Sequence, residues 1–271
     1  NIVQKIAIHS VPRSGSTWLG EILNSSPTVK YCFQPLFSYQ FKDFLDENSS
    51  KKELDKFFSI LNYTDDDFIC QKSQREAGIL PCVKKSVLTT HVVYKEVRYH
   101  HILENLLRVD EGIKLILLVR DPIEVMNSWI NAPEEFDANW NTEKELLTAE
   151  LKNQGRKENF YGLDSWIETT RLFENLAKNY SKRTLLIRYS LLKSSPLQTV
   201  ESLFEFCDLE LTDSTHNFLR ESSEKEVSDN YSVFRGGKEN PILLDDNLVK
   251  TIATYVNDAE LAHYINTEIN E

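Results

Sequence analysis

Four short apolar runs stand out along the chain, and none of them alternates strictly between apolar and polar positions. Such a run is typical of a strand that is buried on both faces, and each of the four is followed by residues with helical spacing. Strands that alternate with helices predict a parallel α/β sheet flanked by helices. The expected strands are Lys5–His9, Val92–Val97, Lys114–Val119 and Thr184–Ile187.

The remaining pattern predicts packing helices and one insertion. Apolar residues recur at helical spacing in residues 164–180, 196–206 and 243–265. Between the first two expected strands, residues 35–89 carry runs of charge, among them the three consecutive Asp residues at 65–67. We expect this stretch to be an insertion with one or two helices that lies over the ligand edge of the sheet.

Length and charge narrow the classes of protein that this chain can be. A chain of 271 residues with 41% hydrophobic composition can bury one large core, so we expect a single domain over residues 1–271. The net charge of −11 argues against nucleic-acid binding, because affinity for a phosphate backbone needs clustered Lys and Arg. No run approaches the roughly 18 apolar residues of a membrane span. The chain begins at Asn1, so an upstream leader or anchor stays open, as does the oligomeric state.

The cysteines and the glycosylation sequons do not decide the class or the cellular compartment of the protein by themselves. Four cysteines form neither a dense disulfide framework nor a metal-binding spacing. Cys70 and Cys82 can close a loop or remain buried thiols, and both interpretations stay open. Five N-x-Ser/Thr sequons suit a protein of the secretory pathway, although a chain rich in Asn and Ser also produces them by chance. They lie at Asn24, Asn48, Asn62, Asn179 and Asn230.

The first candidate site is the loop at residues 13–18, which follows the first expected strand and precedes a helix. A small-residue loop in this context turns backbone N–H groups and the positive end of a helix dipole toward one point, where phosphate or sulfate can bind. Gly15 lets the backbone approach a ligand closely, and Arg13 supplies a permanent charge that can bridge two anionic oxygens. Hydroxyl donors come from Ser14, Ser16 and Thr17.

This loop matches neither of two better-known turns. The G-x-x-x-x-G-K-[ST] pattern of a Walker A loop is absent, and no Gly stands two residues before Ser14 or Ser16, as a nucleophile elbow requires. An ordinary strand-to-helix turn with a Ser cap is the structural alternative. The loop alone does not decide between that turn and an anion site.

The second candidate site follows the third expected strand, which ends on Arg120 and passes directly into a helix. Asp121 suits the N-cap, Pro122 suits the first helical position, and Glu124 predicts a capping box. Arg120 is thereby expected at the carboxyl end of a parallel strand, the edge at which open α/β sheets bind ligands. Ser128, about two turns along the helix, can add a hydroxyl to the same anion.

Together the two motifs resemble the sites at which sulfotransferases bind 3′-phosphoadenosine 5′-phosphosulfate (PAPS). Residues 13–18 resemble the 5′-phosphosulfate loop, and Arg120 with Ser128, eight residues apart, resembles the pair that holds the 3′-phosphate. Residues 91–99 and the Arg of the first loop are similar to the Golgi carbohydrate 6-O-sulfotransferases. Residues 188–192 are similar to an Arg-Tyr-Glu-Asp-Leu strand end, with Ser190 and Leu192 differing.

The resemblance extends from Ile6 to about Leu209. It implies a single-domain parallel sheet flanked by helices, of the P-loop nucleotide-kinase-like type. It also implies PAPS as the donor, with 3′-phosphoadenosine 5′-phosphate (PAP) as the product, and no metal. The implied acceptor is a carbohydrate hydroxyl, such as the 6-position of an N-acetylhexosamine. The Golgi lumen is the implied location, and the cytoplasm is the alternative.

The resemblance also implies roles for single residues around the donor. Arg13 stabilises the charge on the bridging oxygen and the 5′-phosphate while the sulfuryl group moves in line. Lys95 faces the donor, with Arg98 as its rival and Glu96 as a partner for either. Trp18 and Tyr189 contact the adenine or are simply core aromatics. Arg235, in the basic glycine loop at residues 234–238, closes over the 3′-phosphate.

Gln34 is the main departure from the family pattern. Carbohydrate and tyrosyl-protein sulfotransferases carry a Glu there, 21 residues past the loop Arg, as the general base. A Gln amide cannot take a proton at neutral pH, although it can hydrogen-bond a hydroxyl. Three explanations stay open. Gln34 is an engineered replacement for Glu, the register of the resemblance is shifted at this position, or another residue acts as the base. The isosteric shape of Gln favours the first. The candidates for another base are Glu96, His100, His101 and His9.

Other functions remain open from the sequence. Within the same class, the acceptor can be a tyrosine, a lipid or a small alcohol. A nucleotide-dependent phosphate-transfer enzyme of the same fold is the alternative from another class, although the Walker Lys and a Mg²⁺-binding carboxylate motif are missing. Gln34 also leaves open a non-catalytic protein that binds PAPS or a glycan.

Overall fold

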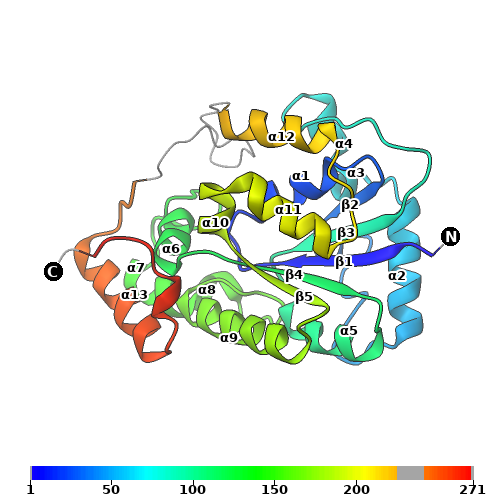
Figure 1. Ribbon diagram of the computed structural model, residues 1–271. Helices are drawn as coiled ribbons and strands as arrows, with labels where there is room; N and C mark the ends of the chain where they lie inside the picture. Colours follow the sequence, from blue (N-terminus) through cyan, green and yellow to red (C-terminus); the bar gives the residue numbers. More distant parts are fainter. Residues whose placement is uncertain (1, 225–240, 270–271) are drawn as a thin grey trace.

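A parallel sheet of five strands forms the centre of the molecule, in the order β2-β3-β1-β4-β5 (Figure 1). The computed structural model describes residues 2–224 and 241–269. The sheet and its flanking helices confirm the α/β fold class expected from the alternation of strands and helices. The strands are β1 (Gln4–His9), β2 (Val29–Phe33), β3 (His91–Glu96), β4 (Lys114–Val119) and β5 (Thr184–Arg188).

The expectation of four strands was wrong, because β2 forms a fifth. It pairs with β3 only, with Val29 opposite His91 and Phe33 opposite Lys95. As an edge strand it is only partly covered, and Lys30 interrupts its apolar run while its Nζ donates to the Thr64 carbonyl at 2.7 Å. This Lys breaks the apolar run of β2, whereas β5, at the opposite edge of the sheet and no more buried, keeps an unbroken apolar run at residues 185–187. Gln34 therefore lies at the carboxyl end of a strand.

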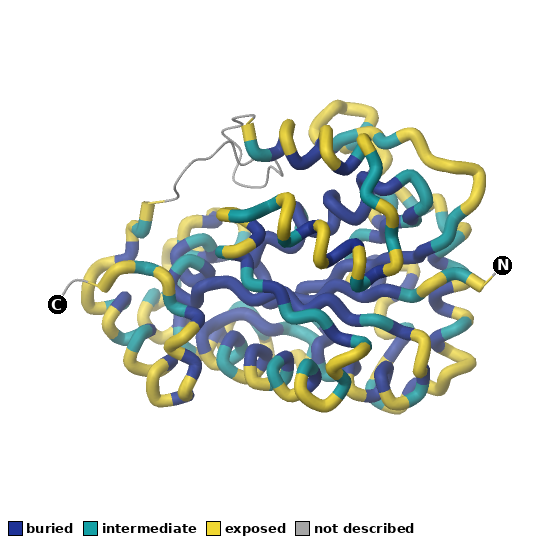
Figure 2. The backbone as a smooth tube through the Cα atoms, viewed as in Figure 1, coloured by how far each residue is buried: buried dark blue, intermediate teal, exposed yellow. Residues whose placement is uncertain are grey.

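Helices cover both faces of the sheet (Figure 1). Neighbouring side chains on a strand point to opposite faces of a sheet. Between the two layers, β3 and β4 are buried along almost their whole length (Figure 2). One face packs against α1 (Ser16–Asn24), α10 (Tyr189–Ser194), α11 (Pro196–Phe206) and α12 (Asp213–Glu224). The other packs against α2 (Lys51–Tyr63), α5 (Leu103–Val109), α6 (Pro122–Ile130), α7 (Thr142–Thr148), α9 (Leu163–Asn179) and α13 (Asp246–Asp258).

The three expected helices differ in how closely they match. The helix expected at 196–206 is α11, and the one expected at 164–180 is α9, displaced by one residue. The last was expected over 243–265 but is only α13, followed by a short 3₁₀ turn at Ala262–Tyr264. Glu260, with φ of 62°, adopts the left-handed conformation and ends the helix there. Among the described residues, no helix has the length and apolar character needed to cross a membrane.

The segment 35–89 divides between two parts of the molecule. Its longest helix, α2, begins with a capping box from Ser50 and Glu53 and buries one face against the sheet. Its later helices are short, and α3 lies against β2. The segment thus contributes both to the core and to the surroundings of the β2 carboxyl end. The shorter elements of the chain are the 3₁₀ turns Pro35–Phe37 and His100–Ile102 and the helices α3 (Asp67–Cys70), α4 (Lys72–Glu76) and α8 (Glu150–Asn153).

All four cysteines are free. Cys70 and Cys82 do not form the bridge that was considered, and they are not buried thiols either, because Cys70 is half-buried and Cys82 is exposed. Each thiol instead donates to a backbone carbonyl, Cys70 to Thr64 and Cys82 to Arg75.

Candidate active site

The loop between β1 and α1 forms an anion cradle. Arg13 and Gly15 both have positive φ, 70° and 91°, which turns the backbone sharply before the helix. A Cβ atom on Gly15 would lie 2.4 Å from a ring carbon of Tyr189, so only Gly fits. Among the described residues, no side chain caps α1, and the Ser14 hydroxyl is buried without a hydrogen-bond partner. The uncapped N–H groups and the free hydroxyl suit an anion.

Arg120 fixes the second motif against this loop. It is only 5% exposed, and its Nη1 donates to the Arg13 carbonyl at 3.1 Å. Its guanidinium lies over the ring of Tyr189, 4.4 Å from the ring centroid. The same ring lies against Gly15, so Tyr189 packs against both motifs.

The capping box expected at α6 was wrong. Asp121 does cap the helix, since its carboxylate accepts from the Ile123 N–H at 2.8 Å. Glu124, however, accepts from the Arg120 Nε at 3.1 Å instead of reaching back to the N-cap N–H. The buried guanidinium attracts the carboxylate more strongly than a neutral N–H does.

Arg13 and Ser128 connect the motifs directly. The Arg13 Nε donates to the Ser128 Oγ at 2.9 Å, although the two residues are far apart in the sequence. Together with the bond from Arg120 to the Arg13 carbonyl, this contact places the two sequence motifs in one site. An anion bound by one motif therefore lies beside the other.

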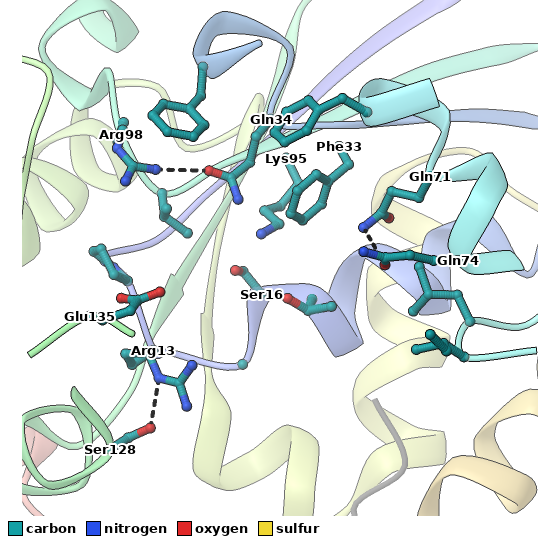
Figure 3. A pocket seen from close by; sticks show the side chains of 18 of the residues that line it. Arg13, Ser16, Phe33, Gln34, Gln71, Gln74, Lys95, Arg98, Ser128 and Glu135 are labelled. Carbon is teal, nitrogen blue, oxygen red and sulfur yellow. Dashed lines mark hydrogen bonds between the residues drawn. The ribbon is translucent and has the colours of Figure 1, made fainter. Parts of the chain in front are cut away.

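A cavity of about 680 Å³ opens at this site, at the carboxyl ends of the strands (Figure 3). Its charge is locally positive although the whole chain carries −11. The cations that line it are Arg13, Lys95, Arg98 and Arg120. The other lining residues that the sequence indicated are Gly15, Ser16, Thr17, Gln34 and Ser128.

Three indicated residues do not line this cavity. Ser14 is buried in the loop, and Tyr189 lies beneath Gly15 and Arg120. Trp18 is buried, and its Nε1 donates to the Ser222 Oγ at 3.0 Å. These positions suit support of the loop. Arg235 and the rest of the basic glycine loop at 234–238 lie outside the described residues.

Lys95 reaches the cavity from the buried strand β3. It is 2% exposed, and its Nζ lies 4.5 Å from the centroid of the Phe33 ring. Burial lowers the pKa of Lys95 to about 8, against the smaller opposing effect of Glu96. An anion placed next to this ammonium would stabilise its charged form.

Gln34 lies beside Lys95 through the pairing of β2 with β3. Its backbone N–H donates to the Lys95 carbonyl at 2.8 Å, and its φ of 40° turns the chain away from the strand. The side-chain Oε1 accepts from Arg98 Nη1 at 3.1 Å (Figure 3). The amide is therefore held at the cavity wall by a cation.

None of the four alternative bases lines this cavity. Glu96 follows Lys95 and so points to the opposite face of the sheet, where its Oε1 accepts from the Leu36 N–H at 2.7 Å. Burial raises the pKa of Glu96 to about 8. His9 is buried with its Nδ1 2.9 Å from that of His100. His101 lies 3.6 Å from a carboxylate oxygen of Glu47.

Several lining residues were missed by sequence reasoning. Phe37, Phe68, Gln71 and Gln74 come from the segment 35–89, and Glu135 and Tyr161 come from loops outside any motif. No periodicity or motif marks them, because only the tertiary packing brings them to the cavity. Among the described residues, no group of three or more His, Cys, Asp or Glu side chains could hold a metal ion.

The sheet order and the strand–loop–helix turn after β1 define an α/β protein of the P-loop-like class. A family model described as "Sulfotransferase domain" matches residues 4–261, and the chain belongs to the sulfotransferase family. This match confirms the resemblance to sulfotransferases and the expectation of an enzyme. No curated protein matches the chain.

Solved structures share this fold. A mouse sulfotransferase, SULT7A1, complexed with PAP, is 15% identical over 94% of this chain and 84% of its own, with a TM-score of 0.55. The sulfotransferase STF9 from Mycobacterium avium is 15% identical over 99% and 78% of the two chains, with a TM-score of 0.53. Retinol dehydratase in complex with androsterone and PAP is 13% identical over 97% and 82%, with a TM-score of 0.55.

Proposed function

We propose that this sulfotransferase moves the sulfuryl group of PAPS to a hydroxyl of a carbohydrate and leaves PAP as the product. The observation that carries the donor assignment is the contact between Arg13 and Ser128, with Arg120 bound to the Arg13 carbonyl. These contacts bring two candidate anion-binding motifs together at one cavity, as a ligand with phosphates at two positions requires. The PAP in the mouse and retinol dehydratase structures supports the same donor class.

In this proposal each motif holds one end of the donor. The uncapped N–H groups at the start of α1, with the hydroxyls of Ser16 and Thr17, hold the 5′-phosphosulfate. Arg120 and Ser128 hold the 3′-phosphate. Arg13 and Lys95 neutralise the charge that grows on the oxygen between phosphorus and sulfur as the bond breaks. Catalysis of this kind rests on placed charge and in-line orientation.

The cavity wall supports a carbohydrate acceptor. Phe37 and Phe68 are 48% and 41% exposed, and their ring centroids are 6.2 Å apart. The Phe68 ring also lies 5.5 Å from that of Phe33. Beside them Gln71 and Gln74 offer amide groups. Aromatic faces suit the apolar faces of a sugar ring, and amides suit its hydroxyls and an N-acetyl group. A tyrosine, a lipid or a small alcohol is the alternative, and the androsterone held by retinol dehydratase favours a small alcohol.

The donor assignment is tested by calorimetric titration with PAP, adenosine 5′-phosphate and ATP. We expect PAP to bind wild type at least about tenfold more tightly than adenosine 5′-phosphate, because charged hydrogen bonds to the 3′-phosphate contribute about 1.5–3 kcal/mol. Arg120→Ala should abolish this preference. The control Arg108→Ala removes an exposed Arg that donates a hydrogen bond to Asn105, and this variant should retain the preference for PAP. PAP binding no tighter than adenosine 5′-phosphate would favour a phosphate-transfer enzyme.

A substitution at Gln34 tests whether the protein is an enzyme or only binds its ligands. If it replaces a Glu base, Gln34→Glu should raise sulfuryl transfer by about 10²-fold or more. Donor binding without turnover, even in Gln34→Glu, would instead favour a protein that only binds PAPS or a glycan. The assay is transfer of ³⁵S from labelled PAPS to N-acetylglucosamine.

The Golgi lumen is the proposed location, with the cytoplasm as the alternative. Two sequons support it, because Asn48 and Asn179 are exposed and open to glycosylation. Asn24 is 6% exposed, and its Nδ2 donates to Glu21 at 3.2 Å, so it is closed to modification in the folded chain. Secretory expression should give glycans at Asn48 and Asn179, detected as a mass shift that an endoglycosidase removes.

A further inference from the structure

Transfer to a neutral hydroxyl requires a group that accepts its proton, and only two of the described residues lining the cavity carry a carboxylate. These are Asp67 and Glu135. Both oxygens of Asp67 accept from the Ser73 hydroxyl at 2.9 Å, and one also accepts from its N–H at 2.8 Å. These bonds hold the pKa of Asp67 below its usual value, which makes it a poor base.

Glu135 is held in a different way. It follows α6, and its backbone carbonyl accepts from Trp129 Nε1 at 3.2 Å, which anchors the loop to the core. Its Oε2 accepts from the Tyr161 hydroxyl at 2.8 Å. Among the described residues, no group donates to Oε1. One oxygen thus orients the carboxylate, and the other is available to an acceptor hydroxyl.

The surroundings of Glu135 place it with the transfer machinery. Figure 3 shows its side chain projecting into the cavity from the side on which Arg13 and Ser128 lie. Burial is the main influence on the pKa of Lys95, but the Glu135 charge also acts on it and raises it. Tyr161 is buried beside it, and burial followed by the Glu135 charge raises the Tyr161 pKa, so its hydroxyl stays a donor.

We propose that Glu135 is the general base for the acceptor hydroxyl, a role that rests on the proposed sulfuryl transfer. The acceptor oxygen forms a bond to sulfur while the bond from sulfur to the 5′-phosphate oxygen breaks, and its electron pair stays on PAP. The hydroxyl proton passes to Glu135 Oε1 and then to water. Tyr161 is a positioning residue, and Gln34 hydrogen-bonds the acceptor without taking its proton.

The test compares two acceptors in Glu135→Gln, which keeps the shape and an oxygen for Tyr161. With ³⁵S-labelled PAPS and N-acetylglucosamine, we expect kcat/KM to fall about 10²- to 10⁴-fold. With 4-nitrophenol, whose oxygen is already largely ionised at mildly alkaline pH, we expect a fall of less than about fivefold. The acidic limb of the pH profile should also disappear with N-acetylglucosamine. Glu134→Gln, at the exposed neighbouring position, should behave as wild type.

The outcomes separate this role from the donor site. PAP titration of wild type reports on the proposed function alone, and failure there removes it whatever Glu135 does. If PAP binds, three results would overturn the role of Glu135. They are an equal loss of kcat/KM with both acceptors, a loss below about threefold with N-acetylglucosamine, and no transfer by the wild type to either acceptor. If Glu135→Gln does not fold, Glu135→Ala with added formate replaces it, and a failure of formate to restore transfer to N-acetylglucosamine overturns the role.

Discussion

At the scale of single residues, Lys95 combines burial with a position at the cavity. Its ammonium lies over the Phe33 ring, and no carboxylate of the described residues pairs with it, so its charge is poorly stabilised until an anion binds. The sequence pointed to this residue because a Lys inside an apolar strand must reach an anion or water. It could not point to Glu135, which no pattern distinguishes from the other Glu residues of the chain.

Donor affinity should depend on pH through Lys95. Its pKa is lowered to about 8, so below that pH the ammonium is already charged and PAP affinity should be flat. Above it, binding must first take up a proton, and affinity should fall by up to about tenfold per pH unit. Lys95→Arg should remove this slope, because Arg stays charged. Calorimetric titration from pH 7 to pH 9.5 measures PAP affinity in wild type and in Lys95→Arg. An identical slope in the two proteins would contradict a contact between Lys95 and the donor.

At the scale of elements, the loop before α1 and the strand β2 show what local sequence can and cannot determine. The loop was located from its small residues and Arg13, because its chemistry is local. β2 was missed because Lys30 interrupts its apolar run, so that only its pairing with β3 identifies it as a strand. The wall formed by Phe68 and Gln71 was missed for a related reason, since α3 is placed by its packing against β2.

Gly15→Ala should damage the loop through contact as well as backbone strain. The new methyl would meet Tyr189 at 2.4 Å, at a residue whose φ is 91°. Gly78→Ala is the matched control, because Gly78 has φ of 72° with nothing within 4 Å of the added Cβ. We expect strain to lower the free energy of unfolding of both variants by about 1 kcal/mol or more. Only Gly15→Ala should also weaken PAP affinity, by more than about tenfold. Thermal unfolding and PAP titration measure this, and equal PAP affinity in the two variants would contradict it.

At the scale of the whole molecule, the sheet order places the polar ends of β1, β2, β3 and β4 at one edge, as parallel α/β folds require. The apolar pattern of the chain predicted this arrangement for β1, β3 and β4 but not for β2. The fold also buries ionisable groups on the opposite face, including Glu96, whose Oε2 has no hydrogen-bond partner among the described residues. Such a group makes the stability of the whole fold depend on pH.

Glu96→Gln should stabilise the fold in a pH-dependent way. The folded pKa of Glu96 is raised to about 8, so between pH 4.5 and 8 the unfolded chain loses this proton first, and wild-type stability falls as pH rises. The variant and wild type should unfold alike at pH 5, and the variant should be more stable at pH 8, since each pKa unit corresponds to about 1.4 kcal/mol. Thermal unfolding at both pH values tests this, with the exposed Glu104→Gln as control. A variant less stable at pH 8 would contradict it.

The alternation of side chains along β3 has a practical consequence for redesign. Lys95 and Glu96 are consecutive, yet the backbone layer separates the cavity from the apolar face that holds Glu96. Turnover and thermal tolerance are therefore tuned from opposite sides of one strand. Substitutions that raise thermal stability can be sought on the Glu96 face of the sheet, and substitutions that change the acceptor can be sought on the Lys95 face.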